Sequence, residues 1–193
     1  MPESTPSPDK QELRKLLRAR RGAITPEQRA RAARQAARLA SQLPHWPTAH
    51  TVAFYMASAE EFDCGPLLER AWQADKDIYL PVMNRGNALD FHRHAPGEPL
   101  HEQRYGILEP PASAKRISIS GLDIMFLPLV GWNHRGTRLG MGAGFYDRAL
   151  TQERPGALIG LGFDCQECDA LPSDGWDVPL DWIVTETRIV RAH

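Results

Sequence analysis

The first apolar pattern along the chain has a helical period. Leu13, Leu16 and Leu17 recur at spacings of three and one, so they fall on one face of a helix. Asp9 stands before this run as a candidate N-cap, and Glu12 follows three residues later as its capping-box partner. The pattern therefore predicts an amphipathic helix that begins beside Asp9.

A second helix is predicted from "TPEQ" (25–28), with Thr25 as N-cap, proline in the first turn and Gln28 closing a capping box. This segment is rich in alanine and arginine and stops before Pro44. After Pro47 the pattern changes to short apolar runs and alternating stretches, which are typical of strands.

The remaining elements follow from these runs. We expect strands at 51–57, 77–83, 88–94, 122–130, 157–163 and 181–186, helices at 65–75 and from near Phe145, a turn at 84–87 and mostly loop over 95–121. Strands that alternate with helices favour the α/β class with a largely parallel sheet. The prediction is a single three-layer α/β/α domain over 9–193, its sheet covered by helices on both faces.

Composition narrows the class of protein. The 193 residues carry a formal net charge of -1, which draws the chain to neither nucleic acid nor membrane. No apolar run approaches the roughly 20 residues that span a bilayer. The proline- and serine-rich start lacks a secretory signal, and we expect 1–8 to be a disordered tail. Three cysteines are too few for a disulfide framework, so a cytoplasmic location is expected.

The stretch "RLGMGAGFYDR" (138–148) carries the most specific candidate chemistry. It has glycine at three alternate positions (140, 142 and 144) and follows a predicted buried strand, with a predicted helix beginning near Phe145. In α/β sheets, ligands bind at such carboxyl ends of strands, where glycines let backbone N–H groups approach phosphate oxygens. Arg138 supplies a planar cation and Asp147 a carboxylate for Mg²⁺. The motif is neither a Walker loop nor a Rossmann fingerprint, and a tight turn that needs glycines for steric reasons is the alternative.

Several ordered motifs identify a family resemblance. The glycine stretch matches the RLG-x-G-x-G-[FY]-YDR signature of the 5-formyltetrahydrofolate cyclo-ligases, also called 5,10-methenyltetrahydrofolate synthetases. The chain resembles this family from Lys10 to Glu186, with further matches at "KQELR" (10–14), "EEFD" (60–63), "YGILEP" (105–110), "LDIMFLPLVGWNHRG" (122–136) and "LPSDGWDVPLDWIVTE" (171–186). The resemblance implies the open three-layer architecture shared with certain sugar-phosphate isomerases and CoA transferases.

The resemblance also implies an activity and its site. The family converts 5-formyltetrahydrofolate and ATP into 5,10-methenyltetrahydrofolate, ADP and phosphate, through a phosphorylated formyl group. ATP contacts are expected at Lys10, Gln11, Glu12, Leu13, Arg14, Arg138, Leu139, Gly140, Met141, Gly142, Ala143, Gly144, Phe145 and Tyr146. Folate contacts are expected at Met56, Glu61, Tyr105, Met141, Gly142, Ala143, Gly144 and Phe145, and Mg²⁺ ligands at Asp147 and Asp177. Arg138 and Tyr146 are the expected catalytic residues, and the partners are small molecules bound by a monomer.

Simpler interpretations stand beside these assignments. Lys10 and Arg14 share a basic helical stripe with Arg18 and Arg21 that would otherwise be a solvated face. Glu61 would be a surface residue, and Asp177 the cap of a turn. The Cys165-x-x-Cys168 pair has metal-ligand spacing but no second pair, which favours incidental cysteines.

Two other functions explain these residues less well, and one position departs from the family pattern. A relative that keeps the fold for regulation or RNA binding would not need these cations and carboxylates together, and a sugar-phosphate isomerase would not need the cations of an ATP site. Some family members carry a lysine where this chain has Ala143. Its role is then absent here, or another residue such as Arg148 fills it.

Overall fold

The protein is described by a computed structural model that covers residues 9–58, 60–84, 88–103 and 106–193. The predicted tail at 1–8 and most of the predicted turn at 84–87 lie outside the described residues. The helices of the described residues are α1 (Lys10–Gly22), α2 (Pro26–Ala40), α3 (Gly65–Gln73) and α4 (Phe145–Leu150), with short 3₁₀ turns η2 (Ile119–Gly121) and η3 (Asp164–Gln166).

Local sequence signals fix where the first two helices begin. The side chain of Thr25 caps α2 and Gln28 closes the predicted capping box. Asp9 caps α1 by accepting a hydrogen bond from the backbone N–H of Gln11 at 3.0 Å. The described contacts of this cap include none from Glu12, so the box predicted there is not formed.

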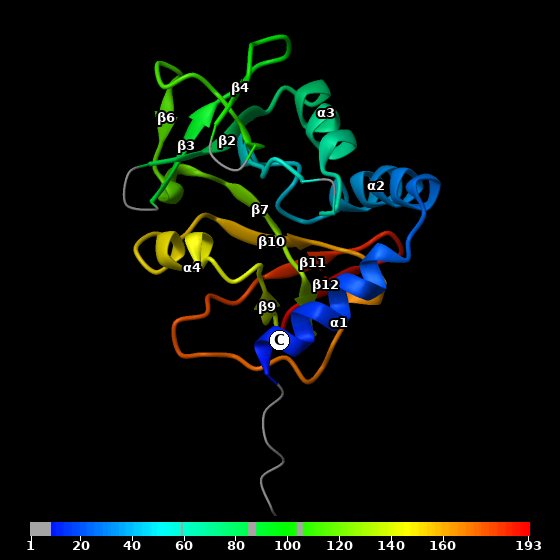
Figure 1. The fold of residues 1–193 in the computed structure, drawn as a ribbon. Helices are drawn as coiled ribbons and strands as arrows, with labels where there is room; N and C mark the ends of the chain where they lie inside the picture. Colours follow the sequence, from blue (N-terminus) through cyan, green and yellow to red (C-terminus); the bar gives the residue numbers. More distant parts are fainter. Residues whose placement is uncertain (1–8, 59, 85–87, 104–105) are drawn as a thin grey trace, which may run out of the picture.

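An eight-stranded sheet forms the centre of the domain, in the order β12-β11-β10-β7-β1-β2-β3-β6 (Figure 1). Its strands are β1 (Thr51–Ala53), β2 (Asp77–Met83), β3 (Leu89–Arg93), β6 (Arg116–Ile117), β7 (Ile124–Pro128), β10 (Ala157–Leu161), β11 (Trp182–Val184) and β12 (Ile189–Arg191). The run from β11 to β2 is parallel, and the strands beyond it at both edges are antiparallel. The prediction of a mostly parallel sheet is confirmed.

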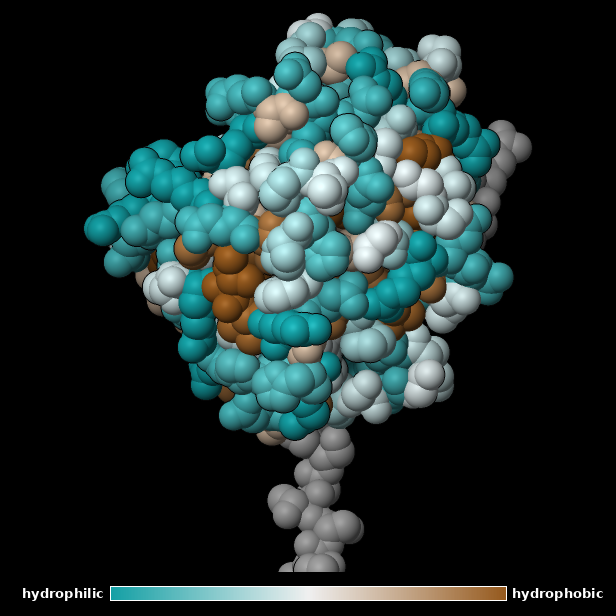
Figure 2. All heavy atoms as spheres, turned by 180° about the vertical axis from the view of Figure 1, so that it is seen from behind, coloured by the Kyte–Doolittle hydropathy of each residue, from teal (hydrophilic) through white to brown (hydrophobic). Residues whose placement is uncertain are grey.

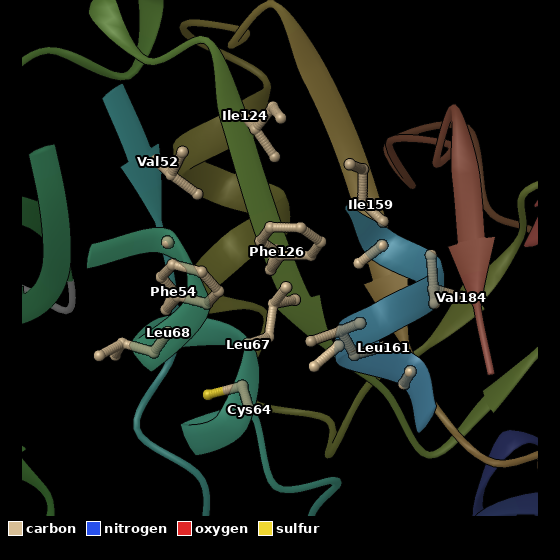
Figure 3. Packing of buried hydrophobic residues seen from close by; sticks show 14 of the residues in the cluster. Val52, Phe54, Cys64, Leu67, Leu68, Ile124, Phe126, Ile159, Leu161 and Val184 are labelled. Atoms are coloured by element: carbon tan, nitrogen blue, oxygen red, sulfur yellow. The ribbon is translucent and has the colours of Figure 1, made fainter. Parts of the chain in front are cut away.

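Helices cover both faces of this sheet, as predicted. Along β7, Ile124 and Phe126 pack into a cluster with α2 and α3, whereas Met125 and Leu127 face a second cluster that includes Leu150 of α4. Figure 3 shows the first cluster, in which the rings of Phe54 and Phe126 stack with centroids 5.0 Å apart. Because both faces of the strand are buried, its sequence is continuously apolar rather than alternating.

The first helix takes a different position from the other three. Leu13 and Leu17 of α1 pack against Val130, which follows β7, and against Leu139 and Leu171. The helix therefore lies at the carboxyl end of β7, beside the loops that leave this edge of the sheet (Figure 1).

One predicted strand was too long, and one predicted loop region contains short strands. The strand predicted over 51–57 keeps its ladder only through Ala53, although Phe54 and Tyr55 beyond it are buried. The region 95–121 is mostly loop, as predicted, but it also contains β6 and a small sheet of β4 (His101–Glu102) with β5 (Leu108–Glu109). Burial of a loop and pairing of two-residue strands depend on tertiary contacts that local pattern does not carry.

The surface is consistent with amphipathic helices packed around this sheet. The face in Figure 2 is covered largely by hydrophilic residues, with hydrophobic residues visible in patches between them. Within the described part of the chain, none of the helices has both the length and the apolar character needed to cross a membrane.

Gly136 fixes the loop that leads into β11. Its φ is +77°, its carbonyl accepts the backbone N–H of Leu180 at 2.9 Å, and a Cβ there would lie 2.5 Å from the Leu180 carbonyl oxygen. We expect Gly136→Ala to lower the free energy of unfolding by about 2–3 kcal/mol, since it adds both backbone strain and a clash. Gly175→Ala, where an added Cβ meets nothing within 4 Å, should be near neutral in the same urea titration. Equal midpoints for the two variants would contradict this account of the loop.

Candidate active site at the carboxyl ends of the strands

The glycine loop leaves the sheet through a hairpin that the sequence did not predict. After β7 the chain forms β8 (Gly131–Trp132) and β9 (Arg138–Leu139), and the loop 140–144 then leads into α4. Gly142 and Gly144 have φ values of +106° and +66°, a region that favours glycine. These two glycines let the loop turn tightly, with Gly144 at the N-cap of α4.

Helix α1 presents its basic stripe to this loop. The Nε of Arg14 donates a hydrogen bond to the carbonyl oxygen of Gly140 at 2.9 Å, and a Cβ at Gly142 would lie 3.4 Å from Cζ of Arg14. Arg14 therefore packs on the loop rather than on a solvated helix face. Of the other positions expected here, Leu13 is buried in the core, and Gln11 and Glu12 are exposed.

Lys10 joins the start of α1 to the loop that precedes β11. Its Nζ donates to Asp174 at 2.7 Å and to Asp177 at 3.0 Å, and the carboxylate of Asp177 also accepts the backbone N–H of Asp174 at 2.8 Å. Partial burial lowers the pKa of Lys10, but the hydrogen bonds to the two carboxylates outweigh this effect and leave the pKa raised. Asp174 was not predicted, although its spacing of three residues from Asp177 around a glycine is the pattern of such a turn.

Arg138 and Asp147 form the innermost ion pair. Nη2 of Arg138 lies 2.5 Å from a carboxylate oxygen of Asp147, and the Arg138 side chain is only 4% exposed. Its guanidinium lies over the ring of Tyr146, 5.8 Å from the centroid, and its buried Nε has no partner among the described atoms. Burial, followed by the charge of Glu61, raises the pKa of Tyr146, so this hydroxyl stays protonated near neutral pH.

The segment after β1 brings the predicted folate contacts to the same edge. Glu61 accepts the backbone N–H of Ser58 at 2.8 Å and acts electrostatically on Tyr146, the residue that follows the glycine loop. Met56 packs partly buried against the core. The predicted contact at Tyr105 lies outside the described residues.

The expected metal ligands are both paired with cations, Asp147 with Arg138 and Asp177 with Lys10. No group of three or more His, Cys, Asp or Glu able to hold a metal occurs among the described residues, Cys165 and Cys168 included. Mg²⁺ at a phosphate needs only one or two carboxylates, because phosphate oxygens and water complete its shell. The hard oxygen donors of Asp147 and Asp177 fit that requirement.

Arg148 contacts the loop at Ala143, the position at which some family members have a lysine. Its Nη1 donates to the carbonyl oxygen of Ala143 at 2.9 Å, and its guanidinium lies 5.4 Å from the centroid of the Phe145 ring. A cation is therefore present beside Ala143 although the residue itself is apolar. Met141, at the outer side of the loop, is 54% exposed.

Together these residues bring three cations to one edge of the sheet: Lys10, Arg14 and Arg138 contact or flank the loops that follow the parallel strands. An α/β domain that gathers cations, glycines with positive φ and carboxylates at this edge has the general form of an enzyme active site. A family model described as the 5-formyltetrahydrofolate cyclo-ligase family matches residues 6–186. The chain belongs to the 5-formyltetrahydrofolate cyclo-ligase family, and it is a ligase of folate metabolism.

Individual relatives agree with this membership. The chain is 39% identical over 180 residues to the 5-formyltetrahydrofolate cyclo-ligase of Escherichia coli K12, which covers 90% of this chain and 98% of the relative. The cyclo-ligase of Haemophilus influenzae is 34% identical over 176 residues, covering 89% and 94% of the two chains. The solved structure of Aquifex aeolicus 5,10-methenyltetrahydrofolate synthetase superposes with a TM-score of 0.83 at 32% identity, covering 94% of this chain and 92% of that one.

The raised pKa of Lys10 generates a prediction about stability and pH. Below the usual lysine pKa of 10.5 its contribution to stability is fully present, and it is lost as pH rises through the higher folded-state pKa. We expect Lys10→Met to lower the free energy of unfolding by no more than about 1 kcal/mol near pH 7. In urea titrations, the difference from wild type should begin to shrink at about pH 10.5 and disappear once the pH exceeds the folded-state pKa.

Lys15→Met is the matched control, because Lys15 is exposed on the same helix. It should leave stability unchanged at every pH. A Lys10→Met difference that stays constant up to the highest pH at which both proteins fold would contradict the ion-pair assignment.

Proposed function

We propose that this protein converts 5-formyltetrahydrofolate to 5,10-methenyltetrahydrofolate with ATP and Mg²⁺, releasing ADP and phosphate. The observation that supports the proposal most directly is the hydrogen bond from Arg14 to the glycine loop, with the cations Lys10 and Arg138 beside the loop. Family membership supports the folate substrate, and these cations support the polyphosphate.

The chemistry explains why ATP is needed. A formamide oxygen is a poor leaving group, so the formyl oxygen first attacks the γ-phosphorus and ADP departs. The product of this step is an iminium phosphate. N10 of the folate then attacks the formyl carbon, loses its proton, and the carbon–oxygen bond breaks to release phosphate. Such a transfer depends on positioning and charge neutralisation more than on a protein nucleophile.

The cations and the glycine loop predicted for the ATP site have separate tasks in this scheme. Lys10 and Arg14 hold the polyphosphate from α1, while backbone N–H groups of the loop 138–146 approach it from the other side. Arg138 offsets charge that develops on the transferred phosphoryl group, and the protonated hydroxyl of Tyr146 donates a hydrogen bond beside it. We assign these two as the catalytic residues.

The folate side is assigned to the other half of the site. The carboxylate of Glu61 accepts N–H groups of the pterin, and Met56 with loop residues 141–145 borders the ring. Asp147 and Asp177 would hold Mg²⁺, which when bound neutralises phosphate charge. We further propose a monomer in the cytoplasm, a reducing compartment that suits the three free cysteines.

The test is direct formation of product. Purified protein mixed with 5-formyltetrahydrofolate, ATP and Mg²⁺ should develop the absorbance band of methenyltetrahydrofolate, with one ADP per folate. Omitting ATP or adding EDTA should abolish the signal, and excess Mg²⁺ should restore the EDTA sample. Product formation without ATP, or none with the complete mixture, would contradict the proposal.

Two neighbouring glycines give a matched pair for the ATP side. At Gly142 the φ of +106° strains any side chain, and an added Cβ would press on Arg14. We expect Gly142→Ala to weaken ATP binding at least about tenfold, or about 1.4 kcal/mol, in calorimetry. Gly140→Ala meets nothing within 4 Å and should change the Kd less than about twofold. Kd values within about twofold of wild type for both variants would mean that the loop is only a structural turn.

A further inference from the structure

We infer that Glu60 is a positioning residue for the folate side of the site, held by an arginine clasp made of Arg18, Arg21 and Arg29. The clasp ties the segment that carries Glu61 to helix α1. This inference deepens the proposed function and rests on it, because it concerns how the folate-binding carboxylate is held in place.

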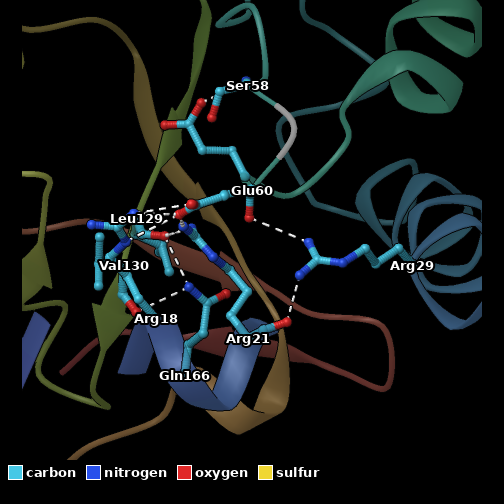
Figure 4. A network of polar contacts seen from close by, with 9 residues as sticks. Arg18, Arg21, Arg29, Ser58, Glu60, Leu129, Val130 and Gln166 are labelled. Carbon is cyan, nitrogen blue, oxygen red and sulfur yellow. Dashed lines mark hydrogen bonds and ion pairs between the residues drawn. The ribbon is translucent and has the colours of Figure 1, made fainter. Parts of the chain in front are cut away.

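The clasp joins two helices to one glutamate (Figure 4). The carboxylate of Glu60 accepts from Nε of Arg18 at 3.0 Å and from its Nη2 at 2.8 Å, a two-pronged contact. Nη2 of Arg21 donates to the same carboxylate at 3.3 Å. From α2, Arg29 donates to the backbone carbonyl of Glu60 at 3.3 Å and also to the carbonyl of Arg21.

Burial differs sharply between the partners. The side chain of Arg21 is 1% exposed, whereas that of Glu60 is 57% exposed. Burial lowers the pKa of Arg21, and the nearby charge of Glu60 opposes this effect. Hydrogen bonding to Arg18 in turn lowers the pKa of Glu60, so the carboxylate stays ionised at neutral pH. A buried guanidinium thus contacts, and helps to position, a carboxylate that is itself largely exposed.

Glu60 is next to the residue assigned to the folate. Glu61 closes a turn in which its backbone N–H donates to the carbonyl of Ser58 at 3.0 Å and its carboxylate accepts from the N–H of Ser58. Any shift of Glu60 therefore moves Glu61 relative to Tyr146 and the glycine loop. Holding Glu60 in three directions limits that movement.

Helix α1 also contacts the glycine loop, on the side of the site that we propose for the phosphates. Arg14 and Arg18 are separated by one helical turn, so they project from the same face of α1. Arg14 bonds to the glycine loop and Arg18 to Glu60. Helix α1 thus sets the spacing between the expected γ-phosphate and the expected pterin, which is the spacing that phosphoryl transfer to the formyl oxygen requires.

An ordinary surface ion pair is the competing explanation, since exposed pairs contribute little to stability. The two explanations differ in what a Glu60→Gln variant changes. A positioning role predicts a KM for 5-formyltetrahydrofolate raised about tenfold, with the KM for ATP within about twofold of wild type and an unchanged urea midpoint. An ordinary ion pair predicts no change in either KM.

Asp77→Asn is the matched control. Asp77 pairs with Arg93 at 2.8 Å with similar side-chain exposure, at the start of β2 and so at the opposite edge of the sheet. It should leave both KM values unchanged. If Glu60→Gln does not fold, Arg18→Gln gives the same comparison, because Arg18 is 45% exposed and its substitution removes its contacts to the carboxylate while the Glu60 side chain itself is retained.

A mutant cycle with Arg18→Gln and Glu60→Gln completes the test. If both residues act through one contact, the double variant should raise the folate KM no more than Glu60→Gln alone. The Kd for folate, measured by calorimetry without ATP, should rank the variants in the same order as the folate KM. A folate KM and Kd within about twofold of wild type for Glu60→Gln, or equal increases for both substrates, would overturn the inference. A wild-type protein that forms no product would instead overturn the proposed function. The comparison of folate Kd values between wild type and Glu60→Gln would still test the positioning role of Glu60.

Discussion

One face of helix α1 sets the geometry of the site, because its cations must be matched by polar groups from loops that are distant in sequence. Lys10 is matched by two aspartates before β11, Arg14 by the Gly140 carbonyl, and Arg18 by Glu60. In each contact, a cation that would otherwise be solvated bonds to a polar group of a loop and so holds that loop against α1. Helix α1 therefore aligns three segments with one another: the glycine loop, the loop that carries Asp174 and Asp177, and the segment that carries Glu60 and Glu61.

The parallel sheet makes this arrangement possible. Its central strands all end at one edge, so the loops that follow β1, β7 and β10 emerge side by side. Leu13 and Leu17 anchor α1 there by packing on Val130 and its neighbours. A phosphoryl transfer that relies on positioning requires such rigidity, because small displacements of the reacting groups cost rate.

The sequence predicted most of this fold, whereas the roles assigned to the site residues stay a prediction. Continuous apolar runs and capping signals located the sheet and helices, and the glycine signature located the loop. What it did not predict depends on contacts between distant segments: the β8–β9 hairpin, the second aspartate at Asp174, and the arginine clasp around Glu60. Glu60 and Glu61 are neighbours with similar chemistry, and only the fold assigns one to α1 and the other to the Ser58 turn.

The proposed reaction requires α1 and the glycine loop to bring the γ-phosphate of ATP against the formyl oxygen. The most direct measurement uses 5-formyltetrahydrofolate labelled with ¹⁸O in the formyl group and follows the label by mass spectrometry after one turnover. The account predicts that the label appears in inorganic phosphate, because the formyl oxygen becomes bonded to phosphorus before the carbon–oxygen bond breaks. Recovery of the label in water, with unlabelled phosphate released, would contradict it.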